Sequence, residues 1–152
     1  MVEIAKDRST PRIQQLSIFL RNRLGALQDA TARLREAEVR ICAISILDAA
    51  DHAVIRMVVN RPYLARTALE AAGYGVFESE LLGVALPEEK DRGIQKVLTC
   101  LLRAEVDIKY VYSLIDHLDG KPVLALNVDN CDWAGEVLQK AGMMLVGQDE
   151  VA

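Results

Sequence analysis

Two groups of residues in this chain have types and spacing that could bind a small charged molecule. The first is the polar stretch Asn22-Arg23-Leu24-Gly25, which lies between an aliphatic segment and an apolar helical pattern that begins at Ala26. A glycine there lets a ligand approach the backbone closely, and the unpaired N–H groups of a first helical turn attract a carboxylate. The second is Ala37-Glu38-Val39-Arg40-Ile41, which recurs 67 positions later as Ala104-Glu105-Val106-Asp107-Ile108. Because the copies differ by a reversal of charge at one position, we expect two unequal binding sites.

No arrangement of side chains typical of an enzyme is present in the sequence. There is no Ser-His-Asp or Cys-His order, no P-loop and no dinucleotide-binding glycine pattern. His52 and His117 both fall in loops, and we assign neither a metal-binding nor a catalytic role to them. Cys42, Cys100 and Cys131 are odd in number and lack CxxC spacing, which predicts reduced thiols and no zinc site. We therefore expect a protein that is not an enzyme and that has no catalytic residue, metal or cofactor.

Composition and charge exclude two further classes of partner. The net charge is -4, the sequence pI is near 5.2 and aromatic residues make up 5% of the chain, which argues against a nucleic-acid-binding surface. The longest apolar runs, such as residues 81–86, are too short to cross a membrane, and residues 1–12 lack the core of a signal peptide. With free cysteines, these features predict a cytoplasmic protein that contacts neither nucleic acid nor membrane.

The repeat extends well beyond the five-residue segment. At the same offset of 67 positions, one apolar helical face is copied, with Leu27 and Leu34 matching Ile94 and Leu101. Further along, the segment 69–73 matches the segment 138–142 at an offset of 69 positions, and both end in Ala-Gly. Repeats of this length are small domains rather than solenoid units. We therefore predict two modules, over residues 12–80 and 81–150.

Each module is predicted to be a βαββαβ unit. In the first, we expect strands at 16–20, 39–47, 53–59 and 76–79, with helices at 26–38 and from Asn60, as its cap, to Gly73. In the second, we expect a strand at 82–86, a helix at 94–105, a hairpin over 108–115 and 123–128, and a helix from Asp129 to Gly142. Pro62 fits a first helical turn. The fold class is therefore α+β, with two ferredoxin-like modules whose antiparallel sheets carry helices on one face, and adjoining strands that run together near Glu80.

The strands are apolar on both faces, which predicts a covering for the face without helices. Apolar residues occur on both parities of 41–46 and of 54–59. Large exposed apolar faces are uncommon on monomers, so we expect this face to pack against another sheet, most simply in a homodimer. Tyr110 and Tyr112 share one parity of a strand, where they either fill a gap between modules or line a ligand pocket.

The order of these features resembles the ACT domain, a small ferredoxin-like module that binds amino acids and regulates metabolic enzymes. The resemblance rests on a strand followed by Asn22-Arg23-Leu24-Gly25-Ala26-Leu27, then a helix that ends in Ala37-Glu38-Val39-Arg40-Ile41, and on the second copy of this order. In the family, the ligand is held by the Asn or Asp and the glycine of the loop, and by a polar residue early in the second strand of an adjacent module. Leu24 stands where the family usually has proline.

The resemblance implies a set of ligand-binding residues in both modules. In the first module these are Asn22, Arg23, Leu24, Gly25, Ala26, Leu27 and Arg40, and in the second Glu89, Gly93 and Asp107. Without a gap, Gly25 aligns with Arg92, so Gly93 would have to supply the turn through a shift of one residue. Glu89 and Asp107 would repel a carboxylate but could hold an ammonium group.

The resemblance implies a tandem ACT protein that binds a free amino acid between modules and regulates a client metabolic enzyme. An alternative is a regulatory subunit of a biosynthetic enzyme, like the small subunit of acetolactate synthase, although that subunit couples its ACT module to a different second domain. A ferredoxin-like acylphosphatase would use Arg21 or Arg23 with Asn22, but its glycine-rich phosphate loop is missing. The preferred hypothesis is therefore an amino-acid-binding regulatory protein.

Overall fold

One long strand belongs to both modules. The computed structural model describes residues 10–21, 24–88 and 92–151. Strand β4 (Gly75–Ala85) pairs through its first part with β1 (Ile13–Arg21), and through its last residues with β6 (Val123–Val128) and β7 (Met144–Val146). All partners of β4 are antiparallel to it. The expected boundary between residues 80 and 81 therefore lies inside a strand, and the adjoining strands run together there as predicted.

The order of elements confirms two βαββαβ units. The remaining elements are α1 (Ala26–Glu36), β2 (Ile41–Asp48), β3 (His52–Val59), α2 (Pro62–Ala71), α3 (Gly93–Arg103), β5 (Ile108–Ser113), α4 (Cys131–Lys140) and α5 (Gln148–Val151). The strands pair in the order β2-β3-β1-β4-β6-β5, with β7 added to β4. The first module's sheet and the second module's sheet therefore meet at β4, which belongs to both. The short helix α5 was not predicted, because its four residues carry no apolar period. Strand β1 begins at Ile13, earlier than the predicted residue 16. The polar residues Gln14 and Gln15 interrupt the aliphatic run from which the strand was predicted.

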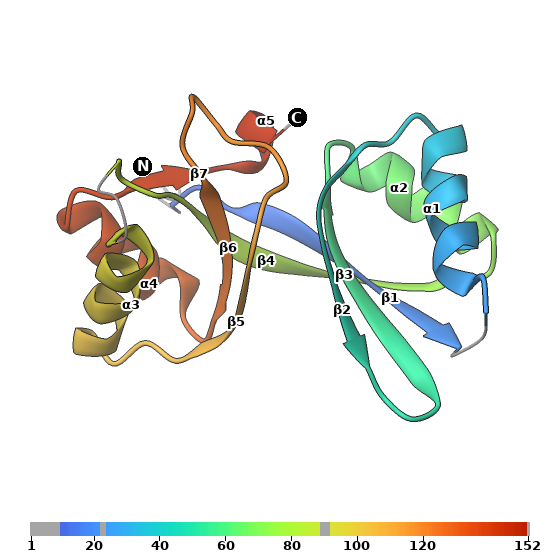
Figure 1. The fold of residues 1–152 in the computed structure, drawn as a ribbon, viewed down its shortest axis with the longest axis horizontal. Helices are drawn as coiled ribbons and strands as arrows, with labels where there is room; N and C mark the ends of the chain where they lie inside the picture. Colours follow the sequence, from blue (N-terminus) through green and yellow to red (C-terminus); the bar gives the residue numbers. More distant parts are fainter. Residues whose placement is uncertain (1–9, 22–23, 89–91, 152) are drawn as a thin grey trace, which may run out of the picture.

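The helices lie on the two outer sides of the molecule, and the helix-free sheet faces are turned toward each other (Figure 1). Helices α1 and α2 cover one core and α3 and α4 cover another. A third apolar cluster joins the two sheets, and it comprises Ile13, Cys42, Ala43, Val58, Leu81, Ala85, Val123, Ala125, Val146 and Val151. The prediction that this face packs against a sheet is therefore confirmed. The second sheet belongs to the same chain, and the homodimer remains a prediction.

All four long helices end in the same hydrogen-bonded turn, which explains why their last residues are repeated. In each, the second residue past the cap donates its N–H to a carbonyl five residues earlier. These pairs are Val39 to Leu34, Tyr74 to Leu69, Val106 to Leu101 and Met143 to Leu138, at 2.9–3.0 Å. The turn needs a left-handed residue between cap and donor. Gly73 and Gly142 supply it in two helices, whereas Glu38 and Glu105 supply it in the other two, each with a φ of 58°.

Glu38 is an exposed side chain in this strained conformation, so replacing it with glycine should stabilise the protein. The left-handed region costs a side-chain-bearing residue about 1–2 kcal/mol, and the added freedom of glycine in the unfolded chain costs about 0.4–1 kcal/mol. We expect Glu38→Gly to raise the free energy of unfolding by about 0.5–1 kcal/mol in urea titrations. Glu36→Gly, two residues earlier inside α1, should lower it, and a loss of stability in Glu38→Gly would contradict the assignment.

Candidate functional site

The loop between β1 and α1 has the glycine conformation on which its predicted role depends. Gly25 has a φ of 85°, in the left-handed region, and its carbonyl accepts the N–H of Asp29 at 2.9 Å to begin α1. Ala26 is buried, Leu27 packs partly against the core of the first module and Leu24 is fully exposed. The predicted ligand residues Asn22 and Arg23 lie outside the described residues.

The loop before α3 is built differently. Arg92, which aligns with Gly25, is the N-cap of α3 with a φ of −118°, and Gly93 is the first residue of the helix. A Cβ atom at Gly93 would lie 3.3 Å from the Cβ of Leu86, so close packing accounts for this glycine. Arg92 and Gly93 therefore do not repeat the left-handed turn of the first loop. The predicted residue Glu89 lies outside the described residues.

The charged residue of each repeated segment is held at the start of its strand by an oxygen from the neighbouring strand. The Arg40 N–H donates to Asn60 Oδ1 at 2.8 Å, and the Asn60 N–H donates to the Arg40 carbonyl at 3.1 Å. In the second module, Asp107 and Asp129 exchange the same two bonds, each at 3.2 Å. The backbone around Arg40 and Asp107 is therefore the same, and only the side chains differ.

This contact overturns the prediction that Asn60 caps α2. The N-cap of α2 is Arg61, with no side-chain cap bond, and Pro62 is the first helical residue as predicted. The amide oxygen of Asn60 is used by Arg40 instead, because Asn60 lies one residue too early to reach the first turn. In the second module, Asn130 caps α4 by accepting the N–H of Trp133 at 3.0 Å.

A bulge in β2 brings the Arg40 segment against the second module. The pairing of β2 with β3 shifts between Ile41 and Ala43, which leaves Cys42 as the extra residue. The Cys42 carbonyl accepts the N–H of Ile115 at 2.8 Å, so the edge strand of one module contacts the chain just beyond the edge strand of the other. Arg40 therefore lies at the junction of the modules.

The Arg40 side chain forms part of the wall of a cavity of about 250 Å³ between the modules. Arg40 Nη1 lies 3.3 Å from Asp116 Oδ2, and Nη2 lies 3.4 Å from the Val151 carbonyl. The polar lining also includes His117 and Glu150, and the apolar lining consists of Cys42, Leu114, Leu118, Val146 and Val151. Burial raises the pKa of the Cys42 thiol, with Arg40 opposing this. Cys42 is therefore neutral at physiological pH and belongs to the apolar wall.

Within one chain, the structure does not bring the predicted ligand residues together. Gly25 and Arg40 lie beyond opposite ends of α1, whose 11 residues span about 16 Å. Asp107 precedes β5, whereas the Arg40 cavity lies beyond the other end of that strand. A site that joins the Gly25 loop to Arg40 or Asp107 therefore requires a second copy of the chain, and it remains a prediction.

A polar cluster around the buried Gln15 links the two sheets. Gln15 is 1% exposed, and its Nε2 donates to Ser79 Oγ at 3.0 Å and to the Tyr110 hydroxyl at 2.7 Å. The Tyr112 hydroxyl donates to Gln15 Oε1 at 2.6 Å, and Asn127 Nδ2 donates to the Tyr110 hydroxyl at 3.0 Å. Burial raises the pKa of Tyr112, so this hydroxyl stays protonated as a donor. Of the two predicted roles for the tyrosines, the structure confirms that they fill the gap between modules.

Sequence reasoning missed Asp116, Glu150 and Gln15. Asp116 and Glu150 lie in polar stretches that carry no motif, and both line the Arg40 cavity only because of the way the modules pack. Gln15 interrupts a strand pattern, and an isolated polar residue on the helix-free face of a predicted strand was the available signal. Among residues 10–21, 24–88 and 92–151, no group of three His, Cys, Asp or Glu residues could hold a metal ion, and no helix is long and apolar enough to cross a membrane.

The fold and the cavity define a class of protein: paired ferredoxin-like modules that share a strand and enclose a ligand-sized space at their junction. Residues 11–152 match the family model described as an ACT domain pair. The chain belongs to this family, which confirms the resemblance seen in the sequence. ACT domain pairs are typically regulatory and non-catalytic.

Solved structures share this architecture. Protein BT0572 from Bacteroides thetaiotaomicron is 27% identical, with a TM-score of 0.86 over 94% of this chain and 97% of that one. The regulatory subunit of aspartate kinase from Thermus thermophilus is 11% identical, with a TM-score of 0.61 over 88% of this chain and 91% of that one. The corresponding subunit from Thermus flavus is 12% identical, with a TM-score of 0.54 over 88% and 94%. The likeness to the two kinase subunits is one of fold alone. No curated protein sequence matches the chain.

Proposed function

We propose that this ACT domain pair is a regulatory protein that binds a free α-amino acid in the cavity between its modules. The observation that supports the proposal is the ion pair between Arg40 of the first module and Asp116 of the second, 3.3 Å apart on the wall of that cavity. An α-amino acid carries one negative and one positive group. Its carboxylate would pair with the Arg40 guanidinium, and its ammonium group would pair with Asp116.

The Arg40–Asp116 pair is well suited to exchange with such a ligand. The two side chains are 54% and 75% exposed, and ion pairs in that environment contribute at most about 1 kcal/mol. Opening the pair therefore costs little, whereas a guanidinium can bind a carboxylate through two parallel hydrogen bonds. The ligand's own side chain would contact the apolar lining at Cys42, Leu114 and Val146.

Regulation follows from the position of the cavity, because its lining comes from both modules. A ligand held there stabilises the module arrangement that contacts it, and a client enzyme that prefers this arrangement is biased in turn. The client would be a metabolic enzyme, as the family resemblance implies. We place this function in the cytoplasm, where the three free cysteines remain reduced.

A thermal-shift screen with the twenty standard amino acids tests the proposal. An amino acid present at 100 times its Kd adds about 2.7 kcal/mol of stability, which corresponds to about 5–10 °C in Tm for a chain of this size. We expect one or a few amino acids to raise the Tm of the wild-type protein, and we expect Arg40→Ala and Asp116→Ala each to weaken binding at least tenfold. Arg35→Ala, on exposed α1, is the matched control and should bind normally.

Two outcomes would contradict the proposal. In the first, no amino acid shifts the transition at millimolar concentration. In the second, a shift occurs and survives both Arg40→Ala and Asp116→Ala. If Gly25→Asp abolishes a shift that Asp116→Ala leaves intact, the ligand binds at the β1–α1 loop instead. That site needs a second copy of the chain, so light scattering should then give the mass of a homodimer.

A further inference from the structure

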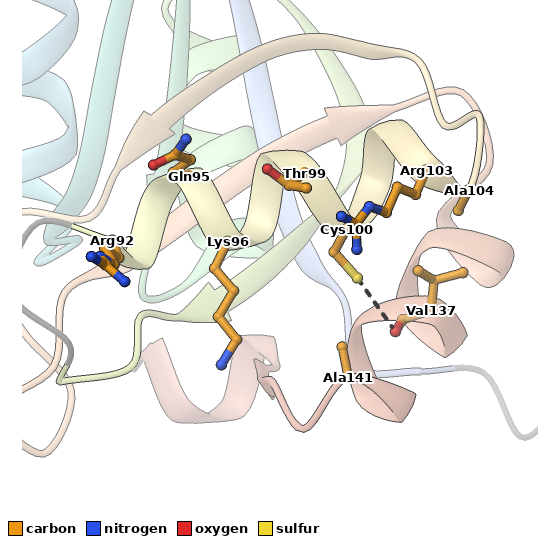
Figure 2. A pocket seen from close by; sticks show the side chains of 9 residues that line it. All are labelled: Arg92, Gln95, Lys96, Thr99, Cys100, Arg103, Ala104, Val137 and Ala141. Atoms are coloured by element: carbon orange, nitrogen blue, oxygen red, sulfur yellow. Dashed lines mark hydrogen bonds between the residues drawn. The ribbon is translucent and has the colours of Figure 1, made fainter.

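A second cavity lies on the outer side of the second module, between α3 and α4, away from the junction of the modules. Its volume is about 650 Å³, within the range of pockets that hold small organic molecules. Figure 2 shows that its side chains come mainly from α3, with Val137 and Ala141 contributed from the neighbouring helix and its end. We call this cavity the α3–α4 groove.

The α3–α4 groove combines a positive rim with a floor of small apolar groups. Arg92, Lys96 and Arg103 are exposed and lie along its rim, in a chain whose net charge is -4. The floor is formed by Cys100, Val137 and Ala141, and the Cys100 thiol contacts the Val137 carbonyl at 3.8 Å (Figure 2). Small side chains on this floor leave the space between the helices open.

The duplicated module provides an internal comparison, because the same face of α1 borders a cavity of about 530 Å³ but carries charges of both signs. At the offset of 67 positions, Lys96 corresponds to Asp29, Cys100 to Arg33 and Arg103 to Glu36. Arg33 Nε lies 3.6 Å from Asp29 Oδ1, and the Tyr74 hydroxyl donates a hydrogen bond to Asp29. Packing of the module therefore does not require three positive residues at this face.

We infer that the α3–α4 groove is a binding site for a small organic anion with an apolar body. The apolar body would lie over Cys100, Val137 and Ala141, and the anionic group would pair with the positive residues of the rim. Ion pairs at an exposed rim are individually weak, so the apolar floor and the summed charge of the rim must act together. This site is independent of the amino-acid cavity, because the two share no lining residue.

The test uses 8-anilinonaphthalene-1-sulfonate, an apolar anion whose fluorescence rises when it leaves water. We expect saturable binding of one molecule per chain to the full-length protein. Lys96→Asp with Arg103→Glu, which restores the charges of the first module, should weaken binding at least tenfold. Cys100→Leu should also weaken binding by filling the floor without changing the charge. Arg35→Glu with Arg61→Glu, which reverses two exposed charges elsewhere, should leave binding unchanged.

Competition and thiol labelling give two further readouts. Octanoate should displace the probe, whereas octylammonium should not. Bound octanoate should also slow alkylation of Cys100 in the folded protein, measured afterwards by mass spectrometry of its peptides. Lys96→Gln with Arg103→Gln is a milder pair should the charge reversal disturb folding. Probe binding that is unchanged in both charge variants, or equally reduced by the Arg35 and Arg61 control, would overturn the inference. Amino-acid binding should persist in all groove variants, so the two proposals can fail separately.

Discussion

Gln15→Leu is expected to lower the free energy of unfolding by about 3 kcal/mol. The substitution removes the three hydrogen bonds that Gln15 makes with Ser79, Tyr110 and Tyr112. Tyr112 is left as a half-buried donor with no acceptor from Gln15, and a polar group left unsatisfied on burial costs about 1–3 kcal/mol. Because the bonds to Tyr110 and Tyr112 join the two sheets, the loss should appear as one cooperative transition in urea titrations followed by circular dichroism.

Two further variants separate the hydrogen bonds from simple packing. Gln14→Leu changes the adjacent, exposed glutamine and should alter stability by less than about 0.5 kcal/mol, as is usual for surface substitutions. Adding Tyr112→Phe to Gln15→Leu removes the unsatisfied donor, so the double variant should be more stable than Gln15→Leu alone. If the double variant loses as much free energy of unfolding as Gln15→Leu and Tyr112→Phe lose separately in sum, the Tyr112 hydroxyl and the Gln15 amide are not coupled.

Gly83→Ala should lower the free energy of unfolding by about 2–3 kcal/mol, because β4 has no room for a side chain where it passes between β6 and β7. A Cβ atom there would lie 2.4 Å from Ile13 Cδ1 and 2.7 Å from the carbonyl oxygen of Val146. The end of the Ile13 side chain can move, but Val146 belongs to the backbone of β7, which pairs with β4. Overpacking of this kind costs about 1–3 kcal/mol, or about 6–12 °C in Tm at the upper end.

Gly75→Ala is the matched control in the same strand. A Cβ atom at Gly75 would meet no atom within 4 Å, so this substitution should leave the Tm unchanged or raise it slightly. Differential scanning calorimetry of both variants gives the comparison directly. If Gly83→Ala has the same Tm as Gly75→Ala and the wild type, β7 can move away from β4 at little cost. The close packing at the shared strand would then not contribute to stability.

Much of the fold could be predicted because its signals are local. The apolar period of 94–101 and the Ala-Gly and Ala-Glu-Val helix ends each depend on residues within a few positions of one another. These features identified both modules, their element order and the ACT resemblance. The error at Asn60 was also local in origin, because the N-cap of α2 is the next residue, Arg61. Only the hydrogen bond from the Arg40 N–H shows that Asn60 belongs to the end of the hairpin and not to the helix.

The predicted ligand site needs residues from two modules, so one module cannot form it alone. The sequence correctly predicted the turn at Gly25, but it assigned Arg40 to a neighbouring module without knowing which one. In the structure, Arg40 faces Asp116, which is 76 positions away, and no periodic pattern links the two residues. The missed residues of the cavity all come from the second module, so any method restricted to short windows would miss them as well.

The sequence by itself determined that one βαββαβ module is used twice, that both copies keep the same helix ends, and that the charge at the start of the second strand is reversed between them. These properties depend on backbone preference and on burial of one face of each element, both of which short segments specify. Only the tertiary structure decided that the helix-free faces pack against each other within one chain, that Arg40 meets Asp116 and that α3 presents a positive groove. These depend on how two finished sheets and helices pack, because that packing brings together residues far apart in the chain.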